Sequence, residues 1–253
     1  MKLKYLLTSM VTSAALLLAS CSVYHPQAVD IPLINHQGDG RVDLSVGAST
    51  FLFFPDVLTI NATGSYGIND WLAGQVHLNY GGENIYAQIA PGAYFNLGAK
   101  SVFETYAGLG VGGAWRDNAK VTSSGDSDTV GSSSHTYSYS GSYLLPFVQF
   151  NIGFHDLTKA HIDLAFGLKT GAFMPDYTYN RYDSDGVQMS EYFTHYTLPS
   201  LLLEPQLQFR IGGEHVKYNL RVGVAYLSDM QNNATKHFNY DFITLSTGLT
   251  FTF

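Results

Sequence analysis

Residues 244–253 decide the fold class and read Thr-Leu-Ser-Thr-Gly-Leu-Thr-Phe-Thr-Phe. One face carries Leu245, Leu249, Phe251 and Phe253, and the other carries Ser246, Gly248, Thr250 and Thr252. An alternation of period two predicts a β-strand with one apolar and one polar face. The strand closes on an aromatic residue.

The same period recurs along the chain and predicts ten strands, at about 41–53, 57–68, 71–80, 84–97, 102–115, 142–155, 160–173, 197–211, 215–227 and 240–253. These lengths suit a tilted membrane-crossing strand, which needs about 9–11 residues. Only 13 % of the residues are charged, against about 25 % in a typical soluble domain. We therefore predict an all-β fold, a transmembrane antiparallel up-and-down β-barrel of about ten strands over residues 41–253. A soluble barrel or sandwich is the alternative, and it would bury the apolar face instead.

The connections predict the orientation. Four are short, near Asn69-Asp70, 98–101, 156–159 and Gly212-Gly213, whereas 116–141 and 174–196 are long. Outer-membrane barrels have short periplasmic turns and longer external loops. An even strand count then places both ends of the chain on the periplasmic side.

The N-terminus has the pattern of an exported protein. Residues 1–20 combine Lys2 and Lys4, an apolar run and small residues, which predicts a signal peptide. Leu18-Ala19-Ser20-Cys21 resembles the lipobox of bacterial lipoproteins, which implies acyl chains such as palmitate on Cys21 at the periplasmic side. An ordinary signal peptide with an incidental thiol is the alternative. Residues 21–40 form an extended segment with apolar positions, expected to dock on the periplasmic mouth or in the lumen.

Two further resemblances point to the same location. The closing strand resembles the C-terminal signal by which bacterial outer-membrane barrels are recognised for insertion. Tyr24-His25-Pro26, Ile31-Pro32-Leu33, 61–66 leading to 69–71, and 102–110 resemble outer-membrane β-barrel lipoproteins of the Bacteroidetes. That group has no assigned activity, so the resemblance implies location and fold only.

Charged residues on the polar faces form a predicted lumen network: Glu104, Asp163, Lys169, Glu204, Arg210, Lys217 and Arg221. A hairpin turn at Gly212-Gly213 would place Glu204 opposite Arg221 and Gln208 opposite Lys217. The functional interpretation is a selectivity filter or proton path. The alternative, which we favour, is a polar plug, because side chains fill barrels of about eight strands.

The second long loop contains candidate binding residues: Tyr177, Tyr179, Tyr182, Tyr192 and Phe193. Tyrosines among polar residues suit recognition of sugars or protein partners, and they equally suit the aromatic girdle of a barrel. Asp183 and Asp185 are a weak calcium candidate, with a solvated turn as the alternative.

The sequence indicates the function of the protein less clearly than its fold. Without residues 1–20 the chain has 11 Lys and Arg against 20 Asp and Glu, so no basic surface predicts nucleic-acid binding. We find no cofactor motif and no metal motif beyond the calcium candidate. The leading hypothesis is a non-enzymatic surface barrel whose long loops bind a protein partner, as an accessory subunit of an outer-membrane assembly. A narrow pore for small solutes is the second. A surface hydrolase using His195, Asp229, His237 and Asp241 is the third.

Overall fold

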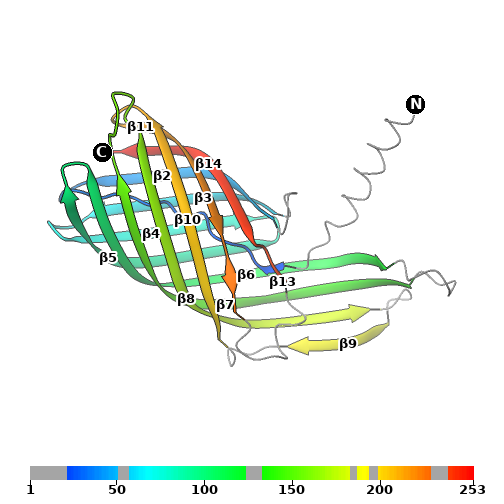
Figure 1. Ribbon diagram of the computed structural model, residues 1–253. Coiled ribbons are helices and arrows are strands. Elements are labelled where there is room, and N and C mark those ends of the chain that lie inside the picture. The colour runs from blue at the N-terminus through cyan, green and yellow to red at the C-terminus, as the bar shows by residue number, and fades with distance from the viewer. Residues whose placement is uncertain (1–21, 51–56, 124–132, 183–186, 194–198, 229–238) are drawn as a thin grey trace, which may run out of the picture.

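The computed structural model describes residues 22–50, 57–123, 133–182, 187–193, 199–228 and 239–253, and all regular structure in them is β (Figure 1). No helix in this part of the chain is long and apolar enough to cross a bilayer. The strands are β1 Ser22–Tyr24, β2 Gly40–Thr50, β3 Val57–Gly67, β4 Leu72–Gly81, β5 Asn84–Gly98, β6 Ser101–Ser123, β7 Ser133–Phe154, β8 Asp163–Tyr182, β9 Gln188–Phe193, β10 Ser200–Gly212, β11 Val216–Val224, β12 Tyr226–Leu227, β13 Asn239–Tyr240 and β14 Ile243–Thr252.

Ten of these strands close into an antiparallel barrel, which confirms the predicted fold class and strand number. The ring runs β2-β3-β4-β5-β6-β7-β8-β10-β11-β14 and returns from β14 to β2. Closure between β8 and β10 runs from Ser200↔Phe173 to Arg210↔Asp163. Since every barrel strand then has two neighbours, the ring has no free edge.

The barrel exposes apolar side chains and buries polar ones, the opposite of a soluble protein. The outer face exposes Leu58 (72 %), Ile60 (64 %) and Ile89 (62 %), whereas inward Asn61 and His77 are fully buried. This alternation of apolar outside and polar inside is that of a transmembrane barrel, and it excludes the soluble alternative.

The closing strand seals the ring beside Gly40. The Gly40 N–H donates to the Phe253 carbonyl at 2.9 Å, and the Phe253 N–H returns the bond at 3.0 Å. A Cβ on Gly40 would overlap the Phe253 ring. A larger residue at position 40 would have to displace this ring.

The long connections are largely strand, which corrects their prediction as loops. Strands β6 and β7 remain paired to Ser123↔Ser133, and β8 pairs with β9 from Thr178↔Phe193 to Tyr182↔Gln188. Ser, Thr and Tyr dominate these stretches, and Thr and Tyr favour strands. We call residues 117–123, 133–140, 175–182 and 188–193 the outer ribbon, because they project beyond the barrel rim in Figure 1.

The predicted register between β10 and β11 is wrong by four residues, because the turn lies two residues further along the chain than predicted. Gln208 lies opposite Arg221, and Gly212 lies opposite Lys217. The Gly213 N–H donates to the Val216 carbonyl at 2.8 Å, so Glu214 and His215 are the two central turn residues. A shift of four, like any even shift, keeps each side chain on its face, and for that reason the inward assignments still hold.

The N-terminal segment, residues 22–39, threads the barrel from mouth to mouth. Residues 24–34 are all buried. Near one mouth the Gly38 N–H donates to Gly67, and at the other β1 pairs with β13. The described chain therefore begins at the long-connection mouth and ends at the short-turn mouth, opposite ends in Figure 1. The expectation that both ends share one mouth is wrong, because this segment crosses the lumen before β2 begins.

Candidate functional site: a lumen occupied by the N-terminal segment

Asp30 of the N-terminal segment lies at the centre of the site, where its carboxylate meets two arginines. Arg210 Nη2 is 2.7 Å from Asp30 Oδ1, and Arg221 Nη1 is 3.8 Å from the same oxygen. Gln208 Nε2 donates to that oxygen at 2.8 Å. All of these side chains are about 1 % exposed or less. Because the carboxylate is paired and hydrogen-bonded, its burial is compensated.

Wall side chains also bind the backbone of the segment. Carbonyl groups accept from Arg221 (Ala28), Gln206 (Val29), Gln75 (Asp30), Arg210 (Ile31) and Arg41 (Leu33). The Ile31 N–H donates to Gln208 at 2.8 Å, and the Ile34 N–H donates to Glu104 at 2.7 Å. Leu33 has a φ of 57°, unusual for a non-glycine residue, and bonds on both sides of it hold this conformation.

Small inward residues make room for the segment. Ile31, Leu33 and Ile34 are fully buried against a wall that includes Ala73, Ala90 and Ala165. A Cβ on Gly153 would meet Leu33, and one on Gly167 would meet Ile31. The lumen is therefore filled by wall side chains and the segment together.

The seven predicted lumen charges all point inward and are buried. The register error breaks the predicted Glu204–Arg221 pair: Glu204 meets Lys169 at 2.8 Å, and Arg221 meets Asp43 at 2.5 Å. Asp163 lies 2.7 Å from Lys217 and 3.6 Å from Arg210. Glu104 accepts from Asn151 at 3.0 Å.

Three charged residues of the network were not predicted: Asp30, Arg41 and Asp43. Arg41 and Asp43 share the polar face of β2 with Ser45, so the alternation itself could have found them. Asp30 lies in a segment without a regular period. No sequence signal placed it in the lumen.

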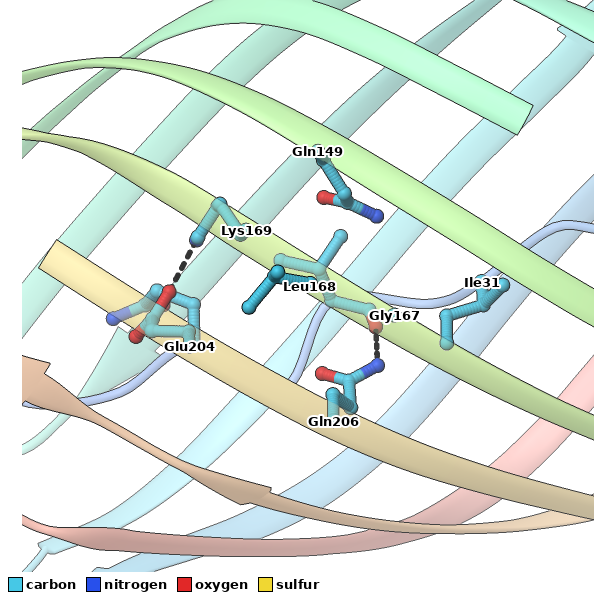
Figure 2. Close-up of a pocket in the computed structure, with 9 residues that line it drawn as sticks. Ile31, Gln149, Gly167, Leu168, Lys169, Glu204 and Gln206 are labelled. Carbon is cyan, nitrogen blue, oxygen red and sulfur yellow. Dashed lines mark hydrogen bonds and ion pairs between the residues drawn. The ribbon is translucent and has the colours of Figure 1, made fainter. Parts of the chain in front are cut away.

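Lys169 and Glu204 form a second centre near the long-connection mouth (Figure 2). The Tyr24 hydroxyl donates to Glu204 at 2.7 Å. Lys169 Nζ also lies 5.5 Å from the Tyr86 ring centroid, within cation–π range. The adjoining cavity, lined in part by Gln149 and Gln206, has about 10 Å³ open to a water centre, which holds about one water. It has no room for a solute.

An aromatic cluster surrounds Tyr24 at this mouth. The Tyr24 ring is 5.6 Å from Tyr143 and 5.1 Å from Phe173, both edge-on. Tyr177, a predicted loop-binding residue, lies in β8 and is 1 % exposed within the cluster. It is thus unavailable to a partner. Tyr179 and Tyr182 are half-buried in the outer ribbon, and the side chains of Tyr192 and Phe193 lie outside the described part.

His25, Ser49 and Asp241 form a third buried group. His25 Nδ1 lies 2.6 Å from Asp241 Oδ2, and the Ser49 hydroxyl donates to the same oxygen at 2.5 Å. In a serine hydrolase the histidine bridges serine and carboxylate through its two different nitrogens. Here the same nitrogen, Nδ1 of His25, faces both Ser49 and Asp241, so the group does not have that arrangement. His195, Asp229 and His237 lie outside the described residues.

Asp156 is the principal charged group of the turn after β7. Partial burial raises its pKa, but hydrogen bonds from His161 (3.0 Å) and Lys217 (3.1 Å) outweigh this effect and lower the pKa to about 2. Asp156 is therefore ionised at neutral pH and ties the turn to β11.

Metal ligation is not evident in the described part of the chain, where no group of three or more His, Cys, Asp or Glu could hold an ion. The calcium candidates Asp183 and Asp185, Cys21 and the signal peptide 1–20 lie outside the described residues.

Comparisons with known proteins add little to this picture. No protein-family model and no curated protein matches the chain. Among solved structures, the translocator domain of autotransporter NalP from Neisseria meningitidis is similar over 88 % of this chain and 91 % of its own, with 10 % identity and a TM-score of 0.39. OmpT, an outer membrane protein of Vibrio cholerae, is similar over 88 % of this chain and 100 % of its own, with 11 % identity and a TM-score of 0.21. At these scores neither supports a functional argument.

Proposed function

We propose that this chain is a non-enzymatic outer-membrane β-barrel that binds a protein partner through the outer ribbon, as an accessory subunit of a larger assembly. The observation that carries the proposal is the ribbon itself. In the outer ribbon, two connections extend as a sheet beyond the barrel. A barrel that served only as a membrane anchor would need no more than short loops at these positions.

Strand β9 is the favoured contact. Within the described residues β9 pairs with β8 alone, and its far edge has no strand neighbour. Val187 is 61 % exposed, and Gln188 and Glu191 are also exposed. An unpaired edge is a template for adding a strand from another chain. We propose that the partner supplies such a strand.

The occupied lumen argues against the narrow-pore alternative in the resting protein. The N-terminal segment crosses the full lumen, and the cavity beside it holds about one water. A small solute has no open path along this segment.

Acylation at Cys21 belongs to the same proposal. Short turns face the periplasm in outer-membrane barrels, and Ser22 lies at the opposite mouth, paired with β13. We therefore propose that acyl chains on Cys21 insert beside the external mouth rather than on the periplasmic side expected from the sequence. Mass spectrometry of the N-terminal peptide tests the modification. Labelling of intact cells near residue 22 tests the side.

Co-extraction in mild detergent tests partner binding. We expect the wild-type protein to carry a stoichiometric partner and Glu191→Arg, on the β9 edge, to lose it. Glu214→Arg makes the same charge change in the exposed short turn and should retain the partner. A protein that migrates alone, or equal loss in both variants, would contradict the assignment to the ribbon.

A further inference from the structure

We propose that the N-terminal segment is a displaceable gate and that the lumen beneath it is an anion-conducting pathway. This goes beyond partner binding at the outer ribbon. It rests only on the barrel crossing a membrane.

The shape of the wall supports a path the width of an extended peptide. Ala73, Ala90, Ala165, Gly153 and Gly167 face the segment where larger residues would fill the lumen. If the segment withdrew, these positions would leave open space, since no wall side chain replaces Ile31 or Leu33.

The way the segment is held supports displacement. Between Tyr24 and Gly40 no described residue joins a sheet; only β1 joins one, with the short β13. Most other backbone contacts are hydrogen bonds to side chains such as Gln75, Gln206 and Arg41, and at the far end Gly38 and Asp39 exchange backbone bonds with Gly67. Water can replace such bonds at modest net cost, because opening exchanges hydrogen bonds within the protein for hydrogen bonds to water.

The charge of the wall sets the selectivity. The described barrel strands bury five basic residues, Arg41, Lys169, Arg210, Lys217 and Arg221, against four acidic ones, Asp43, Glu104, Asp163 and Glu204. Asp241, beside Ser49, and Asp30 of the segment bring the buried acidic groups to six.

Displacing Asp30 would take away the carboxylate that Arg210 and Arg221 share, so the charge around these two residues would become more positive. The Nε atoms of these two residues and of Arg41 are buried without a hydrogen-bond partner in the described structure. They are donors available to a passing anion.

Currents across planar lipid bilayers containing the full-length protein test the gate. Asp30→Asn weakens the charge contacts of the segment, and Ile31→Ala weakens its apolar packing without changing any charge. Asp70→Asn makes the same chemical change in an exposed turn and serves as the control. Each variant is first shown to fold by heat-modifiable migration.

We expect wild type and Asp70→Asn to stay closed. Asp30→Asn should raise the open fraction by about two orders of magnitude, because removing one partner of a buried ion pair strongly disfavours the closed state. Ile31→Ala should open as well, and both should prefer chloride over potassium in a salt gradient.

Three results would overturn the proposal. If both folded variants stay closed, the segment is a fixed part of the core. If wild type conducts as well as the variants, there is no gate. A preference for potassium would refute the anion pathway. None of these results depends on Glu191 or on partner capture. The proposal of a gate and the proposal of partner binding at the outer ribbon can therefore be refuted independently.

Discussion

The Tyr24 anchor offers a direct measure of how firmly the N-terminal segment is held. The Tyr24 hydroxyl donates to Glu204 at 2.7 Å, and the ring packs edge-on against Tyr143 and Phe173. Tyr24→Phe removes only the hydrogen bond to a charged group, which contributes about 1.5–3 kcal/mol. Tyr24→Ala also removes the ring, and such truncations cost about 3–5 kcal/mol.

Hydrogen exchange read by mass spectrometry on the folded, membrane-embedded protein measures the opening. Local opening free energies appear directly as exchange rates, and 1.4 kcal/mol corresponds to a factor of ten. We therefore expect Tyr24→Phe to speed exchange in residues 24–34 by about 10- to 100-fold, and Tyr24→Ala by more. Exchange in β4, whose backbone is held by pairing with β3 and β5, should not change. Equal rates in wild type and both variants would refute the idea that Tyr24 anchors the segment.

Three other perturbations test the lumen, the turn and the seam. Lys169→Met should destabilise the barrel by about 3–5 kcal/mol in urea titration, because it leaves the buried carboxylate of Glu204 without its ion-pair partner. The double variant Lys169→Met with Glu204→Leu should recover most of this stability. A double variant no more stable than the single one would contradict this expectation. The lowered pKa of Asp156, about 2 against about 3.9 for an unfolded aspartate, adds stability above pH 4 that is lost as pH falls toward 2. Asp156→Asn should flatten the stability profile over that range, and an unchanged profile would exclude the ion pair as its cause. Gly40→Val should lower the fraction that folds on heat-modifiability gels because its side chain meets the closing residue, whereas Gly82→Val, with open space around it, should fold normally.

The sequence by itself determined the barrel. Strict alternation in residues such as Leu58, Asn61 and His77 assigns each side chain to a face, because successive strand residues point to opposite sides. Whether a side chain faces the lumen or the outside depends only on whether its position in the strand is odd or even. The assignment of side chains to faces therefore remained correct despite the four-residue register error between β10 and β11.

The tertiary structure decided the site. The ion pairs depend on register between strands, and this register was set by a turn at Glu214 and His215 that glycine preference did not predict. The outer ribbon depends on pairing between β6, β7, β8 and β9, which the Ser- and Tyr-rich composition did not distinguish from loops.

The position of the N-terminal segment was the least predictable feature. Residues 22–39 have no period, and their apolar side chains are equally compatible with a mouth and a lumen. Their place follows from contacts far apart in sequence, such as Asp30 with Arg210 and Tyr24 with Glu204. Only closure of the ring brings these residues together, since the partners of the segment come from strands on all sides of the lumen.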